Sequence, residues 1–273
     1  WFVDNEVTKK LFSVRGVGVG TEFNANAASP VGVYVDEVYQ SFRASHGQQL
    51  YDIDRVEVLR GPQGTLYGRN ALAGTLNIIS AKPKLGEFGG YAQAEISNRS
   101  SYGAEGALNI PLGETFAARV AGMYVNKDFG YRNASTGAEA RALKPAGLEE
   151  NYAGRASLLW EPSDALSVSL IGDYGKETGT GYPGSSIWGA VTDSGLTADR
   201  LKLKDVVYRG TQGDMTNELW GVQGKILYDF GSFSAEASGS AGGPFSLIAK
   251  LEDGRSRQRW TRDAEATRIA AGG

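Results

Sequence analysis

The sequence predicts a mainly β protein, in which a small mixed α/β subdomain precedes a series of antiparallel strands. Two observations lead to this prediction. Before residue 84, short apolar runs are separated by glycine-rich turns, and their periodicity is weak. From residue 88 to residue 238, apolar and polar residues alternate with a period of two, which is the signature of half-buried strands. We therefore expect a first domain at 1–83, strands within 84–238 and an irregular tail at 239–273.

The first domain should contain short strands joined by tight turns. They are predicted at 12–15, 31–38, 55–59 and 75–80. Proline cannot donate a hydrogen bond to a strand ladder, so Pro83 ends the domain. The first residues contain no basic region, apolar region or cleavage site of a signal peptide. We therefore expect the chain to begin inside this domain.

Composition excludes several kinds of functional site. The chain contains 38 glycines and 13 tyrosines, but no cysteine and one histidine, His46. These counts exclude disulfides, thiolate metal sites and His-pair metal sites, and we expect no metal or cofactor. A formal net charge of −3 does not indicate a nucleic-acid partner. No apolar run reaches the roughly 18–20 residues that a membrane-spanning helix requires.

Aromatic residues bracket the apolar faces of the later strands. Seven strands are predicted, near 88–98, 102–112, 115–128, 150–162, 165–178, 216–230 and 232–238. Tyr152 and Trp160 lie near the two ends of one apolar face, and Trp220 and Tyr228 near the ends of another. Aromatic rings settle at the two headgroup levels of a membrane. This arrangement indicates strands whose apolar faces contact lipid.

The links between these strands alternate in length. The second, fourth and sixth links are minimal turns, whereas the third and fifth, near 129–149 and 179–215, are long and polar. Short turns at one rim and long loops at the other are typical of outer-membrane barrels. The predicted fold class is therefore a small mixed α/β subdomain followed by antiparallel strands of an incomplete transmembrane β-barrel.

The alternation also predicts which side chains face lipid. The outer face should carry Leu166, Val168, Leu170, Trp220, Val222, Ile226 and Tyr228. The inner face should carry Ser167, Ser169, Gln223 and Lys225. A slip of one residue would turn every one of these polar side chains toward lipid.

One continuous stretch is similar to a known family. Residues 50–83 read LYDIDRVEVLRGPQGTLYGRNALAGTLNIISAKP. They closely resemble the distal plug signature of TonB-dependent outer-membrane receptors, in which an acidic-Arg-(Ile/Val)-Glu-Val strand leads into Arg-Gly-Pro. Residues 13–18 and 33–38 resemble two earlier plug motifs, although Glu37 replaces the usual glycine of the second. The resemblance covers about residues 12–238.

The resemblance implies a fold, a function and a location. It implies an N-terminally truncated plug domain and the first strands of a barrel of about 22 strands, in the outer membrane of a Gram-negative bacterium. The parent protein would import a scarce ligand, usually a ferric siderophore, when TonB acts through an upstream segment absent from this sequence. Haem, cobalamin or an oligosaccharide are alternative cargoes, and a passive porin is an alternative function. Outer-membrane lipid is the other expected partner.

The resemblance also suggests ligand-binding residues in the plug. The candidates lie in one loop of the plug and are Tyr39, Phe42, Arg43, His46 and Gln48. An arginine with aromatic side chains suits an anionic, catechol-bearing ligand. An ordinary polar loop is the alternative explanation for each of these residues.

Charged residues of the plug are expected to contact the barrel wall. Arg55, Glu57 and Arg60 would be costly to bury in a barrel lumen without partners. Inward-facing residues that could pair with them are Arg119, Arg155, Glu161 and Lys225. The alternative is that the plug charges are merely solvated.

Catalytic constellations are absent from the sequence. Residues 61–69 lack the Gly-Lys-Ser/Thr of a phosphate loop. His46 has no Gly-x-Ser-x-Gly elbow to supply a serine. Asp36 and Glu37 would face opposite sides of a strand and so cannot act as a pair. We therefore expect no enzyme. Arginines around Trp260 leave nucleic-acid contact open, but a non-native tail is the favoured interpretation.

Overall fold

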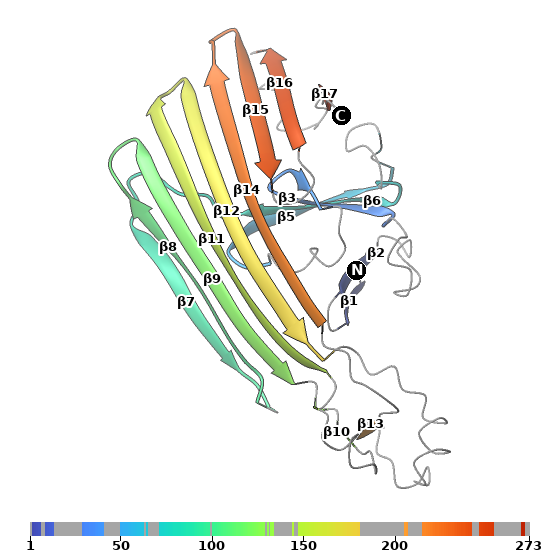
Figure 1. Cartoon of the computed structure of the whole chain (residues 1–273). Coiled ribbons are helices and arrows are strands. Elements are labelled where there is room, and N and C mark those ends of the chain that lie inside the picture. The colour runs from blue at the N-terminus through green and yellow to red at the C-terminus, as the bar shows by residue number, and fades with distance from the viewer. Residues whose placement is uncertain are drawn as a thin grey trace.

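The chain folds into two main sheets and two short strand pairs. The computed structural model describes residues 2–6, 9–13, 29–40, 50–62, 64, 71–98, 100–128, 130, 132–133, 144, 147–180, 205–206, 215–241, 246–253 and 269–270. A nine-stranded sheet, called the wall below, forms a long curved surface (Figure 1). A four-stranded sheet, called the small sheet, lies against one face of the wall (Figure 1).

The small sheet combines parallel and antiparallel strand pairs. It consists of β3 (Val31–Val35), β4 (Val38–Tyr39), β5 (Ile53–Arg60) and β6 (Gly74–Ser80), in the order β4-β3-β6-β5. Strand β3 runs parallel to β6, and the other pairs are antiparallel. A separate antiparallel pair joins β1 (Phe2–Glu6) to β2 (Lys9–Ser13). Gly64 is the one helical residue in the described ranges, so the expected α component is not tested.

The two central strands of the small sheet are fully buried. Val33, Val35, Leu76 and Ile78 form a cluster between β3 and β6, because alternate residues of adjacent strands share a face. The sequence predicts one strand over residues 31–38. The structure instead contains two strands here, separated by a tight turn at Asp36–Glu37. Both turn residues adopt positive φ, which ends β3 at Val35.

The wall is an antiparallel meander. Its strands are β7 (Gly89–Ile96), β8 (Tyr102–Pro111), β9 (Phe116–Asp128), β11 (Leu148–Ser163), β12 (Leu166–Gly179), β14 (Met215–Asp229), β15 (Phe233–Ala241), β16 (Ser246–Asp253) and β17 (Ile269–Ala270). Each strand pairs with the next wall strand along the chain. The first seven lie close to the predicted positions.

The end of the strand region differs from the prediction. The expectation of an irregular chain after Gly239 is wrong for β16, which pairs with β15 along its whole length. Ile248 interrupts the alternation of apolar and polar residues in this run, which is also short and follows Gly-Gly-Pro, a turn signal. Pairing with an existing sheet edge, which a local pattern does not show, stabilises this strand. The expected arginine-rich part of the tail lies outside the described residues.

Two short strands that belong to the long links lie beyond one end of the wall. Strand β10 (Arg132–Asn133) lies in one link and β13 (Asp205–Val206) in another, and the two pair in parallel. Figure 1 shows β10 and β13 beyond the lower end of the wall, while the short turns after β8, β11 and β14 lie at the upper end. The predicted division between a short-turn rim and a long-loop rim is therefore present.

Strand register confirms the predicted faces. Leu166 lies opposite Tyr228 and Val168 opposite Ile226, whereas Ser169 lies opposite Lys225. Opposed residues in an antiparallel pair share a face. The outer face carries large exposed apolar residues, including Leu158, Leu170, Val222 and Ile226. The inner face carries the polar set.

Aromatic residues form two rows on the outer face. The row near the long links contains Tyr102, Tyr124, Tyr152, Tyr174 and Trp220. The row near the short turns contains Phe88, Trp160, Tyr228 and Phe230. Ring centroids are 6.0 Å apart for Tyr102 and Tyr124 and 4.4 Å apart for Tyr228 and Phe230. The rows are separated by about 26 Å along a strand, at roughly 3.3 Å per residue, which is comparable to the apolar band of an outer-membrane barrel.

Within the described part of the chain, no helix has the length and apolar character needed to cross a membrane.

The outer face should not tolerate a charge at mid-height. Leu170 lies between the aromatic rows, opposite Leu158 and Gly224. We expect Leu170→Lys to destabilise the complete protein in a bilayer by about 2–4 kcal/mol, because the ammonium group would face hydrocarbon. Ser167→Lys is the matched control, since that position faces inward beside Glu161. Urea denaturation in lipid vesicles measures both changes, and equal destabilisation would contradict the assigned faces.

Candidate functional site

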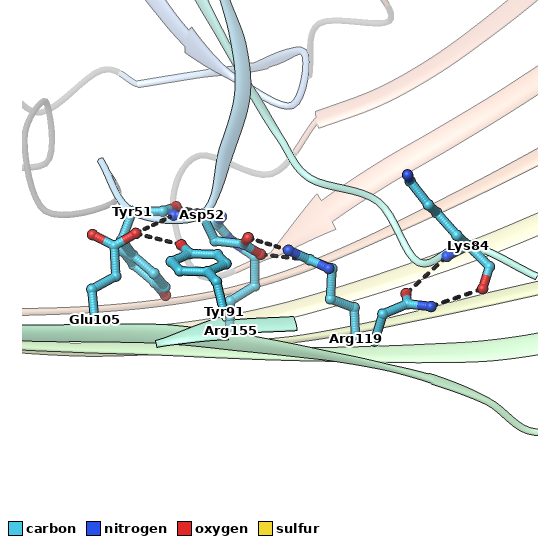
Figure 2. Close-up of polar contacts among 8 residues, drawn as sticks. Tyr51, Asp52, Lys84, Tyr91, Glu105, Arg119 and Arg155 are labelled. Atoms are coloured by element: carbon cyan, nitrogen blue, oxygen red, sulfur yellow. Dashed lines mark hydrogen bonds and ion pairs between the residues drawn. The ribbon is translucent and has the colours of Figure 1, made fainter. Parts of the chain in front are cut away.

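A buried ion pair joins the small sheet to the wall. Asp52, which directly precedes β5, accepts hydrogen bonds from Arg119 on β9 at 2.8 Å (Nε to Oδ2) and 2.5 Å (Nη2 to Oδ1). The Asp52 side chain is 3% exposed and the Arg119 side chain 13%. Two parallel bonds between a guanidinium and a carboxylate fix both distance and orientation. Figure 2 shows the pair bridging the two sheets.

Tyr51 packs beside this pair. Its ring is 1% exposed, and the guanidinium carbon of Arg155 on β11 lies 4.8 Å from the ring centroid. Arg155 also donates a hydrogen bond to the Tyr51 carbonyl at 3.4 Å. Among the described residues, the Tyr51 hydroxyl has no hydrogen-bond partner. Burial raises the pKa of Tyr51 from 10.0 to about 12, and the carboxylates of Asp173 and Asp52 add to the shift while Arg155 opposes it.

Strand β8 of the wall makes further contacts with Asp52 and with the linker at Lys84 that connects the two sheets. Glu105 on β8 accepts hydrogen bonds from the Tyr91 hydroxyl and from the backbone N–H of Asp52 (Figure 2). Asn109 on β8 exchanges two hydrogen bonds of 2.9 Å with the backbone of Lys84. Asn109 thereby fastens the linker to the wall.

The turn between β3 and β4 makes the other contact. The Asp36 carboxylate accepts hydrogen bonds from the Ser80 backbone N–H (2.9 Å) and hydroxyl (2.7 Å), within the small sheet. The Asp36 carbonyl accepts one from the Gln223 amide of β14 at 2.6 Å. Lys225 of β14 lies 3.3 Å from Glu37 and 3.0 Å from Glu236 of β15.

Backbone strain accompanies this turn. Asp36 has φ of 47° and Glu37 has φ of 71°, in the left-handed region that glycine adopts most readily. A residue other than glycine in this region costs on the order of 1–3 kcal/mol. The strain therefore has to be offset by the contacts that the two side chains and the turn carbonyl make.

The three plug residues that the sequence predicts to pair with the wall make no ion pair with it in the described part of the chain. Arg55 pairs at 2.8 Å with Asp54 and with Glu57, all within β5. Glu57 also accepts a hydrogen bond from Asn77 on β6. Arg60 lies exposed at the end of β5. These strands form only part of a barrel, so contacts of the three residues with further wall strands remain a prediction.

Most of the wall residues that the sequence suggests as partners of the plug do contact the first domain. Arg119 and Lys225 form ion pairs with carboxylates of the small sheet, and Arg155 covers Tyr51. Glu161 instead accepts a hydrogen bond from Ser167 within the wall. Sequence reasoning missed Asp52 as a partner, because no local pattern relates it to Arg119.

Most predicted ligand-binding residues cannot be placed. Tyr39 ends β4, where its half-buried ring lies 5.4 Å from that of Tyr34. Phe42, Arg43, His46 and Gln48 lie outside the described residues. Their role in ligand binding therefore stays a prediction.

The interface is polar and partly open. A cavity of about 620 Å³ separates the start of β5 from β7, β8 and β9, with Asp54, Lys82 and Gln93 among its lining residues. Within the described ranges, no group of three acidic or histidine side chains could hold a metal ion. The arrangement seats one sheet on another through paired charges.

Comparison with known proteins identifies the family. Residues 4–75 match the model of the TonB-dependent receptor plug domain. This part of the chain is therefore a plug domain of the kind found in TonB-dependent receptors. It is part of an outer-membrane protein of a Gram-negative bacterium.

Curated relatives are receptors of the same family. The pesticin receptor of Yersinia pestis is 40% identical over 100 residues, which cover 37% of this chain and 14% of the relative. The ferrioxamine B receptor of Salmonella typhimurium is 30% identical over 156 residues, 52% of this chain and 20% of the relative. The ferrienterobactin receptor of Escherichia coli is 32% identical over 187 residues, 62% and 22% respectively. The matched part of this chain spans less than a quarter of each relative's length.

Solved structures share the fold. The ferric yersiniabactin uptake receptor FyuA from Yersinia pestis has a TM-score of 0.69 at 22% identity, covering 91% of this chain and 36% of that one. The ferric-catecholate import receptor Fiu from Escherichia coli has a TM-score of 0.58 at 19% identity, covering 81% and 37%. At this identity the likeness shows the fold of a TonB-dependent receptor, with a mainly β architecture.

Breaking the buried ion pair should cost much more stability than breaking an exposed one. Asp52→Asn leaves the Arg119 guanidinium buried without its counter-charge, so we expect a loss of about 3–5 kcal/mol. Asp54→Asn, which removes an exposed partner of Arg55, should cost about 0–1 kcal/mol. Denaturation of the complete receptor, followed by a fluorophore on the small sheet, measures both. Similar losses in the two variants would show that Asp52 does not anchor the sheet.

The buried hydroxyl of Tyr51 should make stability depend on pH at alkaline values. Because the folded protein holds this proton more tightly than the unfolded chain, the free energy of unfolding should fall between pH 10 and pH 12, by on the order of 1 kcal/mol per pH unit. Tyr51→Phe removes this titration and an unpaired buried hydroxyl. We therefore expect a shallower alkaline loss in the variant than in the wild type. Identical pH profiles would contradict the burial of this group.

Proposed function

We propose that this chain is part of a receptor that imports a ferric siderophore across the outer membrane, with energy supplied through TonB. One observation carries the proposal. A small sheet is fixed by paired charges to the polar face of a wall whose other face is apolar and bordered by aromatic rows. A lumen occupied in this way does not pass a solute by simple diffusion, and opening it requires work.

The relatives support an iron chelate as cargo. The printed names of relatives and structural neighbours include ferrioxamine B, ferrienterobactin and ferric yersiniabactin receptors. We extend this class of cargo to the present protein. Haem, cobalamin or an oligosaccharide would be recognised by the same architecture, and transport competition separates them.

A transport role without catalysis is the simplest account of the site. The charged side chains at the interface of the two sheets form ion pairs with one another. The matching family model also describes receptors. A passive porin would have no need for the small sheet or for the Asp52–Arg119 anchor. A solved structure with a similar fold is that of FpvAI in complex with pyocin S2. A protein of that kind is therefore a second candidate ligand of the complete receptor.

We infer a division of labour along the chain. Residues 1–83 form the plug, and the wall begins after the linker at Lys84 and extends through β16, beyond the limit of 238 that the sequence predicts. The cargo would contact the plug loop at 39–49 and the long links after β9 and β12. The family match over residues 4–75 supports the first limit.

Uptake by the complete receptor tests the proposal. We expect cells lacking their own siderophore receptors to accumulate radiolabelled ferric siderophore when given the complete gene, and to lose this uptake when TonB is removed. Uptake that persists without TonB would contradict energised transport. TonB-dependent uptake of cobalamin or a sugar in place of iron would overturn the cargo alone.

A further inference from the structure

The turn between β3 and β4 combines an unfavourable backbone conformation with an ionic contact to the wall. Glu37 occupies a backbone conformation that favours glycine, with φ of 71°. The side chain that makes this position unfavourable is also the one that reaches across to the wall, where its carboxylate lies 3.3 Å from the Lys225 ammonium. An observed backbone outlier is a reason to look for a function that retains it.

The turn is held from both sides. Within the small sheet, the Asp36 carboxylate accepts two hydrogen bonds from Ser80 at the end of β6, and the Asp36 N–H donates to the Ile78 carbonyl at 2.9 Å. On the wall side, Gln223 donates to the Asp36 carbonyl. A displacement of the turn from the wall would therefore be transmitted directly to β6, one of the two fully buried strands of the small sheet.

Lys225 is the centre of the wall side of the contact. Its side chain is 26% exposed and lies between Glu37 of the turn and Glu236 of β15. Glu236 keeps a counter-charge beside Lys225 when the turn moves away, so breaking the Glu37 contact does not leave a bare cation in the wall. Such a contact can open and close without disrupting the wall.

We propose that the β3–β4 turn is a charge latch, in which Glu37 and Lys225 seal the small sheet against β14 and β15 in the resting receptor. The latch rests on the proposed function only in its purpose, which is to keep the lumen closed until transport. The carboxylate of Glu37 is the reason that this position is not glycine: the contact it makes offsets the strain that it imposes. Opening the latch raises passive permeability along β14 and β15.

Substitution by glycine separates a latch from a merely strained turn. Glu37→Gly relieves the backbone strain and removes the carboxylate, so the turn itself should fold at least as well as in the wild type. A latch predicts that this variant leaks more. A strained turn with no sealing role predicts unchanged or lower leakage. The readout is the entry of a bulky fluorescent dye, in cells that lack TonB and carry equal amounts of the complete receptor.

The expected results are specific to the pair. We expect Glu37→Gly and Lys225→Met each to raise dye entry roughly two- to tenfold. The double variant should leak no more than Lys225→Met alone, because both substitutions remove the Glu37–Lys225 contact and only Lys225→Met also breaks the pair with Glu236. Exchanging the charges, with Glu37→Lys, Lys225→Glu and Glu236→Gln together, should restore much of the seal, because the Glu236 carboxylate would otherwise repel a carboxylate at position 225. Glu57→Gln is the control, since Glu57 pairs with Arg55 inside the small sheet.

Two results would overturn the latch. One is dye entry in Glu37→Gly that equals the wild type. The other is a double variant whose leakage is the product of the two single effects. Neither result depends on which cargo is transported, and a receptor that was an open porin would already show high dye entry in the wild type. Failure of the latch and failure of the proposed function are therefore distinguishable.

Discussion

Every wall strand has to satisfy two different environments at once, and the rest of the structure follows from this constraint. One face contacts lipid and the other faces a polar interior, so the period of two fixes each strand's register. Leu170 and Ser169 are neighbours in sequence, yet one lies on the apolar face while the other lies opposite Lys225. Because the inner face is polar, the small sheet can be seated on it through charges instead of through an apolar core.

The charges that seat the small sheet are distributed between a buried contact and a more exposed one. Asp52 and Arg119 are nearly inaccessible to water, where an unpaired charge would be costly, so this contact is the more permanent one. Glu37 and Lys225 are more exposed, and Lys225 has a second carboxylate beside it. The difference in burial suggests one fixed attachment near the linker and one that can be released.

Local pattern was enough to predict much of the fold, but long-range pairing was not. Alternation over residues 165–178 and 216–230 located β12 and β14 and assigned their faces, because that signal is contained within each strand. Strand β16 could not be predicted, because a short run after Gly-Gly-Pro forms a strand only when the edge of a neighbouring strand is available for pairing. The Asp52–Arg119 contact could not be predicted either, because the two residues are far apart in sequence. Glu37 could be recognised as unusual where glycine is expected, but its partner could be identified only in three dimensions.

Cysteine cross-linking between the turn and the wall tests the central claim most directly, namely that the small sheet is seated on the inner face of the wall in this register. The described chain has no native cysteine to interfere. In cells producing the complete receptor, Glu37→Cys paired with Lys225→Cys should be joined by a short bifunctional thiol reagent that replaces the span of the two long side chains, whose charged ends meet. Glu37→Cys paired with Ile226→Cys should not, because Ile226 faces the opposite side of β14. Cross-linking through position 226, or through neither position, would contradict the account.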